Sequence, residues 1–274
     1  MIKYKGIPAS SITYRKAVNH VSKKALFIGA HNDDCECAAG ATAALLADKG
    51  YETVFLNPAV RHRTPLSGET FWEALRQQDE AARLLGARKI VMGPHGEPPY
   101  QYDDVIYTND RENMLAIRRV LQEEKPDLIF IHWPKDNHVD HAAVSRCSMD
   151  AICLAPCGGW SPREVYAFEA GPYQTMVYFQ PDLYITADSV MDRVKESLLA
   201  FDQPGAGGKW LWKEKEVSAA FRGHVAGVRY AEAFKILKFP VGDQGSELWL
   251  RKDLEEYFSW AGFNAYPWGR KYFL

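Results

Sequence analysis

Short apolar segments alternate with longer, helix-like segments over the first two-thirds of the chain. The apolar segments predict strands at Ala25–Gly29, Thr53–Leu56, Lys89–Gly93 and Asp127–His132. The segments between them predict helices at Ala38–Lys49, Glu69–Leu85 and Arg111–Glu124. Strands that are separated by helices form βαβ units, whose strands run parallel. We therefore expect an α/β fold with a mostly parallel sheet and helices on both faces.

The last third of the chain predicts shorter elements. These are strands at Glu164–Glu169, Thr175–Phe179 and Asp182–Thr186, and helices at Ser189–Phe201 and Lys213–Phe221. A length of 274 residues suits one large domain with at most a small appendage. The aromatic-rich end, Tyr257–Leu274, is expected to pack on this domain or to line a subunit contact.

The charges nearly cancel, with 33 Lys and Arg against 35 Asp and Glu and a net charge of −2. We therefore expect no general attraction to nucleic acid or to anionic membranes. No apolar run approaches the roughly 20 residues of a membrane span, and Met1–Lys24 lacks the apolar centre of a signal peptide. Five cysteines without framework-like spacing favour a reducing compartment, so we expect a cytoplasmic protein.

Two clusters of histidine and carboxylate residues follow predicted strands. The run AHNDDCE at Ala30–Glu36 follows the first strand, and DNHVDH at Asp136–His141 follows the fourth. Sites in parallel α/β sheets lie at the carboxyl ends of strands, where the strand order reverses. Both runs therefore have the position that a shared site requires.

The first run can bind a cation, because a backbone turn lets His31 and Asp34 converge. Zinc accepts imidazole and carboxylate ligands together, and a catalytic zinc site keeps one position open for water. The second run offers the third ligand, with one histidine on the metal and the other facing substrate. The neighbouring Asp33 is placed to take a proton from the activated water, whose pKa zinc lowers to about 7. In the alternative interpretation, these aspartates only cap a helix.

At these residues the chain resembles the LmbE-like (PIG-L) family of zinc-dependent N-acetylglucosaminyl deacetylases. The family motif Ala-His-Pro-Asp-Asp-x-Glu is matched at Ala30–Glu36, except that Asn32 replaces the proline. Its second motif, Asp-x-His-x-Asp-His, is matched in full at Asp136–His141. Weaker similarities extend the resemblance to about residues 23–235, and the family's fold implies a Rossmann-like layer.

The resemblance implies a role for each matched residue. His31, Asp34 and His141 resemble the zinc ligands, and Asp33 resembles the general base. The other implied roles are oxyanion stabilisation or amine protonation by His138, orientation of that ring by Asp140, and substrate contact by Arg76. The resemblance also implies a homo-oligomer. A site of two histidines and one aspartate would also accept other divalent first-row metals.

The loops that would face the substrate differ from the family pattern. Segments 57–63 and 93–96 lack the usual Thr-x-Gly and sugar-contacting Asp. Arg61 and His95 add positive charge there, which favours a substrate with a carboxylate or phosphate, although solvated loop charge is the alternative. Trp133 follows the fourth strand and would stack on a sugar ring or pack in the core.

Our hypothesis is therefore a zinc-dependent hydrolase that removes an N-acetyl or related acyl group from an N-acetylglucosamine-type sugar or sugar conjugate. The alternatives are an amidase of a thiol adduct of a glucosamine-containing cofactor and a metal-binding relative without activity. A nucleotide-binding protein is disfavoured, because no Gly-x-Gly-x-x-Gly run follows the first strand. We expect an extension at residues 1–22, the deacetylase domain at 23–240 and the C-terminal extension at 241–274.

Overall fold

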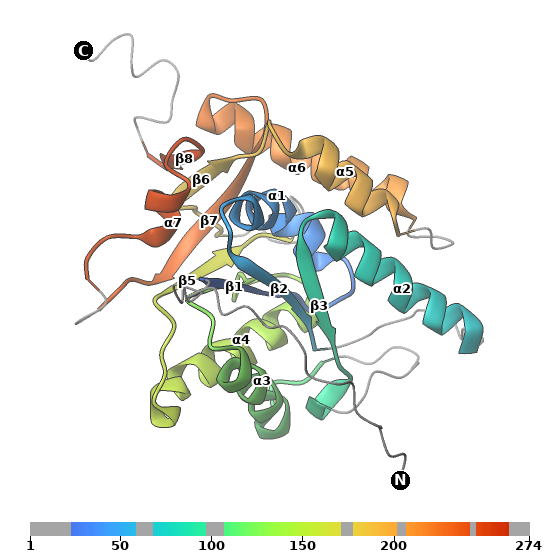
Figure 1. Ribbon diagram of the computed structural model, residues 1–274, viewed down its shortest axis with the longest axis vertical. Coiled ribbons are helices and arrows are strands. Elements are labelled where there is room, and N and C mark those ends of the chain that lie inside the picture. Colours follow the sequence, from blue (N-terminus) through green and yellow to red (C-terminus); the bar gives the residue numbers. More distant parts are fainter. Residues whose placement is uncertain are drawn as a thin grey trace, which may run out of the picture.

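The computed structural model describes residues 23–58, 68–96, 107–170, 178–201, 207–241 and 245–262 (Figure 1). Within these residues the chain forms one α/β domain around a single sheet of eight strands. The strands are β1 (Lys24–Ile28), β2 (Glu52–Asn57), β3 (Ala87–Val91), β4 (Leu128–His132), β5 (Glu164–Phe168), β6 (Leu183–Thr186), β7 (Ala231–Lys238) and β8 (Phe258–Trp260). The helices are α1 (Asp34–Asp48), α2 (Gly68–Leu84), α3 (Arg111–Glu124), α4 (Val139–Cys153), α5 (Met191–Leu199), α6 (Gly208–Ala226) and α7 (Trp249–Asp253).

The sheet is mostly parallel, as predicted. Its order is β3-β2-β1-β4-β5-β7-β6-β8. The first five strands in this order run parallel to one another, whereas β7 is antiparallel to both β5 and β6. The chain builds β1, β2 and β3 in one direction and then returns to place β4 on the other side of β1. The strand order therefore reverses between β1 and β4, and this is where a ligand site is expected.

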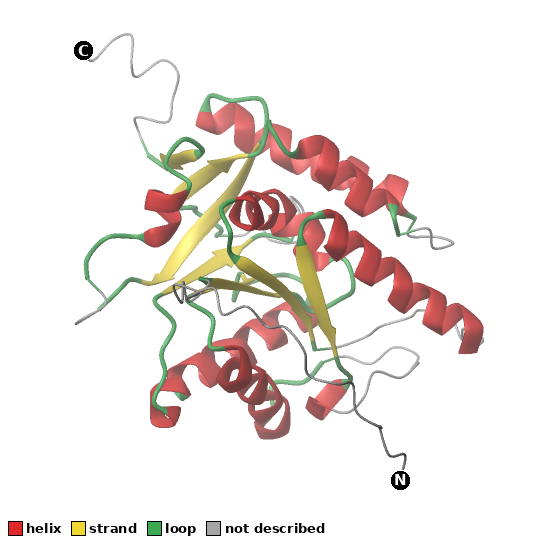
Figure 2. Cartoon of the chain, in the orientation of Figure 1, coloured by secondary structure: helices red, strands yellow, loops and turns green. Residues whose placement is uncertain are grey.

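Helices cover both faces of the sheet (Figure 2). Alternating side chains of β1 explain why, since Ala25 and Phe27 belong to one buried cluster and Leu26 and Ile28 to the other. The first cluster includes residues of α1, α2, α5 and α6, and the second includes residues of α3 and α4. Because both faces are covered, β1 and β4 consist of almost uninterrupted apolar residues, which is why they could be recognised in the sequence.

Several elements differ from the sequence predictions. The strand β7 was not predicted, and α6 begins at Gly208 rather than at Lys213. The residues at the start of α6 include exposed Trp210, whose apolar side chain obscures the amphipathic pattern. The predicted strand 175–179 lies largely outside the described residues, and Tyr178 and Phe179 are not in a strand. The short strand β8 pairs with β6, so the described part of the C-terminal stretch joins the sheet.

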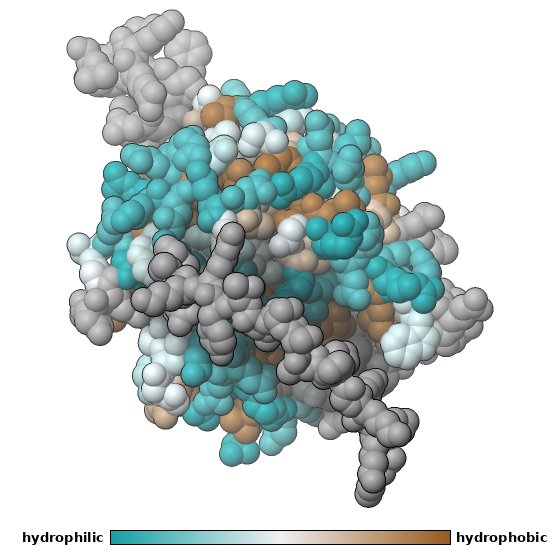
Figure 3. All heavy atoms as spheres, viewed as in Figure 1, coloured by the Kyte–Doolittle hydropathy of each residue, from teal (hydrophilic) through white to brown (hydrophobic). Residues whose placement is uncertain are grey.

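The surface over α2, α5 and α6 is mostly hydrophilic, with smaller groups of hydrophobic residues between (Figure 3). Among the described residues, no helix combines the length and apolar character of a membrane span.

Candidate metal centre

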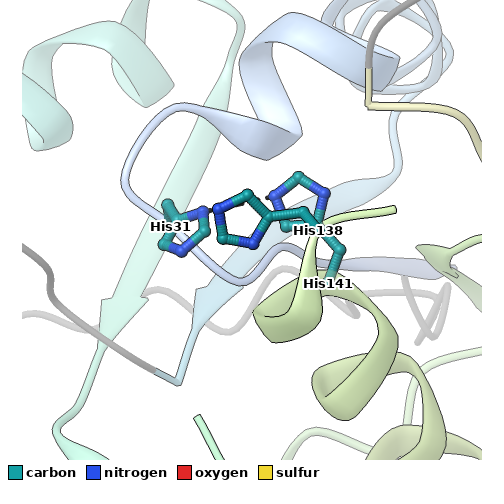
Figure 4. Close-up of side chains that lie close together, drawn as sticks. All are labelled: His31, His138 and His141. Carbon is teal, nitrogen blue, oxygen red and sulfur yellow. Dashed lines mark hydrogen bonds between the residues drawn. The ribbon is translucent and has the colours of Figure 1, made fainter. Parts of the chain in front are cut away.

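Two loops at the carboxyl ends of β1 and β4 bring three histidines together (Figure 4). His31 lies in the loop between β1 and α1, whereas His138 and His141 lie at the start of α4. The ring centroids of His31 and His138 are 4.7 Å apart, and those of His138 and His141 are 4.5 Å apart. Segments more than a hundred residues apart in sequence thus meet at the predicted switch point.

Side-chain atoms of three residues, His31, Asp34 and His141, face one another at the spacing of metal ligands. His31 Nδ1 lies 3.2 Å from His141 Nε2, which lies 3.4 Å from Asp34 Oδ1. The other carboxylate oxygen, Asp34 Oδ2, is 3.6 Å from His31 Nδ1. Ligands in a tetrahedral zinc site with bonds of about 2.0–2.1 Å are about 3.3–3.4 Å apart. The two imidazoles and the carboxylate therefore fit a cation of this size.

The outer nitrogens of the two rings are held by carboxylates. His31 Nε2 is 2.9 Å from Asp140 Oδ2, and His141 Nδ1 is 2.9 Å from Asp136 Oδ2. Such carboxylate partners orient metal-binding imidazoles and fix which nitrogen carries the proton. Asp140 Oδ1 also accepts a hydrogen bond from the backbone N–H of Tyr107. The Asp140 carboxylate thus hydrogen-bonds His31, whereas the sequence analysis assigned it to His138.

The charges of this cluster shift its pKa values. Burial alone favours neutral rings, but the carboxylates of Asp34 and Asp140 outweigh it and raise the pKa of His31 to about 9. Burial is likewise outweighed at His141, where Asp34 and Asp136 raise the pKa to about 10. Although burial opposes ionisation of Asp34 as well, the surrounding histidines, led by His141, hold its pKa well below the usual value. The cluster therefore keeps Asp34 ionised.

The side chain of Asp33 is not used for helix capping. Asp33 is the N-cap residue of α1, yet its side chain makes no capping hydrogen bond. Burial and the neighbouring charge of Asp34 raise the pKa of its carboxyl group. A half-buried carboxylate with a raised pKa is a stronger base than an exposed one.

His138 is the N-cap residue of α4. Its Nδ1 accepts a hydrogen bond of 3.2 Å from the backbone N–H of Asp140. Burial, followed by the charges of His141 and His31, lowers the pKa of His138 to about 4. The ring is therefore neutral at pH 7, and its proton is on Nε2, which can act as a hydrogen-bond donor.

The loop after β1, which carries His31 and Asp33, is tied to neighbouring strands through its carbonyl groups. Asn57 Nδ2 at the end of β2 donates to the carbonyl of His31, and Lys89 Nζ on β3 donates to the carbonyl of Asn32. Lys89 also forms a fully buried ion pair with Glu36, with 2.7 Å between Nζ and Oε1. These contacts hold a loop in which Asn32 stands in place of a stiffening proline.

Two of the predicted substrate-binding residues, Arg76 and His95, are exposed and lie next to carboxylates outside the histidine cluster. Arg76 is exposed on α2, where it pairs with Glu73. His95 is exposed in a 3-10 turn, and its Nε2 is 3.5 Å from Asp110 Oδ2. Among the described residues, no hydrogen bond or ion pair joins either side chain to the histidine cluster.

Trp133 directly follows β4 and is half-buried, with its ring packed edge-on against Phe179 at 5.6 Å between centroids. Its indole N–H is buried and has no hydrogen-bond acceptor among the described residues. The last predicted substrate contact, Arg61, lies outside the described residues.

One residue of the site was missed in the sequence. His132, the last residue of β4, is fully buried, and its Nε2 lies 3.0 Å from Asp34 Oδ2. His132, Asp34 and His141 form one of two groups of three side-chain atoms within 4.8 Å of one another among the described residues, and the other group is His31, His138 and His141. In the sequence His132 reads as the end of an apolar strand, and its place just before the second motif was the only available signal.

The comparisons with known proteins agree with this architecture. The crystal structure of GalB, the 4-carboxy-2-hydroxymuconate hydratase from Pseudomonas putida KT2440, matches with a TM-score of 0.65 and 22% identity, over 81% of this chain and 98% of that chain. N,N'-diacetylchitobiose deacetylase from Pyrococcus horikoshii matches with a TM-score of 0.61 and 22% identity, over 79% and 84%. A deacetylase of teicoplanin biosynthesis matches with a TM-score of 0.55 and 17% identity, over 78% and 97%.

At these identities the structural matches establish the fold. The sequence itself matches a family model over residues 26–152, which include both motifs and extend from within β1 to the last turn of α4. That model is PIG-L, described as GlcNAc-PI de-N-acetylase. The resemblance drawn from the two motifs is thereby confirmed, since residues 26–152 match the PIG-L (LmbE-like) family model.

Proposed function

We propose that this protein is a zinc-dependent hydrolase that removes an N-acetyl or related acyl group from an amino sugar or sugar conjugate. The proposal rests on the distances of His141 Nε2 from His31 Nδ1 (3.2 Å) and from Asp34 Oδ1 (3.4 Å), and on the neighbouring Asp33, whose carboxylate makes no capping hydrogen bond. The family match over residues 26–152 supports the reaction class, because the matched model is described as a de-N-acetylase. Structural matches to deacetylases of chitobiose and of the teicoplanin pathway support it further.

In this proposal, His31, Asp34 and His141 hold the zinc ion. Bound zinc supplies a Lewis acid for the amide carbonyl and lowers the pKa of water to about 7. The Asp33 carboxylate accepts a proton from the attacking water and then delivers it to the amine nitrogen as the C–N bond breaks. Because the ring of His138 is neutral, with its proton on Nε2, it stabilises the carbonyl oxygen as a hydrogen-bond donor.

We assign Asp140 to the orientation of His31, on the strength of its 2.9 Å contact with His31 Nε2. Trp133 is proposed as a sugar contact, because its buried indole N–H has no protein acceptor and a sugar hydroxyl can supply one. Arg61, Arg76 and His95 are proposed as outer contacts to an anionic group of the substrate. We also propose a small-molecule substrate and a homo-oligomer in the cytoplasm.

The proposal is tested by measuring amine release with metal-stripped protein, with and without added zinc. The panel contains neutral and anionic N-acetylated sugars, their conjugates and thiol adducts of an acylated glucosamine. Release that depends on zinc establishes the hydrolase, and the best substrate identifies the class. The matched control is Asp33→Asn, which should bind zinc like the wild type and lose most of its activity. Near-normal turnover by this variant would refute Asp33 as the base.

A similar fold also occurs in a hydratase, because the matched structure of GalB is that of a 4-carboxy-2-hydroxymuconate hydratase. The panel therefore includes this compound, whose conjugated chromophore loses absorbance when water is added across a double bond. Hydration without amine release from any amide would replace the proposed reaction. Bound zinc with neither reaction would identify a metal-binding relative without activity on these substrates.

A further inference from the structure

His132 lies beneath the metal centre, at the carboxyl end of β4. Its ring stacks on that of His141, with 4.1 Å between centroids and 17° between planes. The edge of Phe168 packs against it at 4.8 Å, and Ser145 Oγ donates to its backbone carbonyl at 2.7 Å. The two aromatic contacts therefore hold the ring in one orientation between a proposed metal ligand and the core, whereas Ser145 bonds only to the backbone of this residue.

We propose that His132 is a positioning residue that fixes Asp34 as a ligand through a single carboxylate oxygen. This inference rests on the proposed metal site. It assigns a function to a residue that lies outside both sequence motifs.

The two oxygens of Asp34 have different partners. Oδ2 accepts hydrogen bonds from the backbone N–H groups of Ala30 at 2.8 Å and His31 at 2.7 Å, and it lies 3.0 Å from His132 Nε2. Oδ1 instead faces His141 Nε2 at 3.4 Å. Three N–H donors therefore occupy Oδ2, and Oδ1 is left for the cation. With His132 as the third donor, the carboxylate cannot rotate toward two-oxygen binding without losing a buried hydrogen bond.

The surroundings of the His132 ring determine which nitrogen carries its proton. Nδ1 is buried and has no hydrogen-bond partner among the described residues, whereas Nε2 faces the carboxylate of Asp34. A proton on Nδ1 would leave a buried donor unpaired and two lone pairs facing each other at 3.0 Å. In the other tautomer, Nε2 would accept from the Ala30 N–H at 3.0 Å, but the buried Nδ1 proton would have no acceptor. We therefore place the proton on Nε2, and the Ala30 N–H then donates to Asp34 Oδ2 alone, at 2.8 Å.

His132 could instead be a metal ligand, since Asp34, His132 and His141 also offer atoms within 4.8 Å of one another. Ligation through Nε2 would need its proton to be moved to Nδ1, where no acceptor lies among the described residues. It would also remove one of the three donors to Asp34 Oδ2. Because these costs fall in a fully buried site, the structure favours the positioning role.

The experiment compares zinc affinity in two variants of similar side-chain length, His132→Gln and His132→Met. Glutamine places an amide N–H near the position of Nε2, whereas methionine has no donor. Affinity is measured on metal-stripped, folded protein by competition with a chromophoric chelator. We expect His132→Met to bind zinc about 10- to 100-fold more weakly than the wild type, and His132→Gln to recover most of this loss.

A control and a spectroscopic measurement separate the outcomes. Ser145→Ala, which removes a buried contact to the same residue without touching Asp34, should bind zinc like the wild type. With saturating Co²⁺, the visible spectrum of His132→Met should keep the wild-type band positions, because the ligands are unchanged. Equal losses in the Gln and Met variants with a changed cobalt spectrum would show that His132 is a ligand and overturn the inference. Undiminished affinity in His132→Met would also overturn it, whereas a wild-type protein that binds no zinc would refute the proposed function itself.

Discussion

Replacement of Lys89 by methionine should destabilise the metal-free protein strongly. The side chains of Lys89 and Glu36 are both 0% exposed, and their charged atoms are 2.7 Å apart. Lys89 Nζ also donates to the carbonyl of Asn32, and the second oxygen of Glu36 has no hydrogen-bond partner among the described residues. Lys89→Met therefore leaves a buried carboxylate without its counter-charge. Removing one partner of a buried ion pair typically costs about 3–5 kcal/mol.

The loss in Lys89→Met should depend on pH in a defined direction. Burial raises the pKa of Glu36 even in the wild-type protein, against the opposing charge of Lys89. Without Lys89 its folded-state pKa rises further, so Glu36 is protonated in the folded variant but ionised in the unfolded chain at neutral pH. Stability then falls by up to about 1.4 kcal/mol per pH unit above the unfolded-state pKa of about 4.3. The variant should therefore be closer to the wild type at pH 5 than at pH 8.

Urea unfolding followed by circular dichroism at both pH values measures this effect. The matched control is Arg83→Ala, which breaks the Arg83–Glu80 pair on α2. That pair has the same 2.7 Å distance, but its side chains are 69% and 48% exposed, so the unfolding midpoint should not change measurably. The double variant Glu36→Gln/Lys89→Met should recover much of the lost stability. An unchanged midpoint for Lys89→Met at pH 8 would refute the burial argument.

Three further predictions concern the metal centre and its surroundings. His138→Ala should lower kcat by about 10²–10³ and leave zinc affinity unchanged, because His138 donates to the substrate oxygen rather than to the metal; weaker zinc binding measured by chelator competition would count against that role. Trp133→Phe should raise KM for the best sugar by roughly 2- to 12-fold, the value of one hydrogen bond, and an unchanged KM would place the indole in the core. Zinc should bind more tightly as pH rises from 7 to 9, because the raised pKa values of His31 (about 9) and His141 (about 10) mean that a proton must leave. The facing nitrogens of His31 and His141 are 3.2 Å apart, so we expect them to share one proton. Calorimetry in buffers of different ionisation enthalpy should therefore show release of about one proton per zinc. Release of no proton would contradict the raised pKa values of the two histidines.

The features predicted best from the sequence are those with local causes. The strands β1 and β4 are buried on both faces, so each forms an uninterrupted apolar run. The helix α3 was predicted with the observed limits, because Asp110 caps its first turn and Lys125 ends it in a left-handed conformation. The same apolar runs predicted where β1 and β4 end, and thus where the two histidine-containing motifs lie.

The missed features depend on contacts between distant segments. Whether Asp140 orients His138 or His31 is decided by the relative placement of two loops, because His31 is 109 positions away in sequence. His132 could not be recognised as a partner of Asp34 for the same reason, with 98 positions between them. Local spacing contains no information about such pairs, so the sequence predicted the composition of the site better than its internal hydrogen bonds.

The strand β7 shows how a buried charge hides an element from sequence analysis. Its Glu232 reads as a surface residue, yet the side chain is buried and accepts hydrogen bonds from the backbone N–H groups of Ala41 and Thr42. These groups are available because the backbone of α1 leaves helical geometry at Ala39, with φ −136° and ψ 21°. Lys215 on α6 neutralises Glu232 and also donates to the carbonyl of Ala38, on the other side of the break.

An ion pair from β7 and α6 thus satisfies both sides of an interruption in the helix whose first turn carries Asp34. A helix broken within its second turn would otherwise leave buried N–H and C=O groups unpaired, at a cost of about 1–3 kcal/mol each. The break divides the first turn, with its metal-site carboxylates, from the remainder of α1. Buried side chains from later elements therefore bond to both parts of this segment. Asn57 and Lys89 donate to the carbonyl groups of the loop, and Lys215 and Glu232 bond to the backbone of α1.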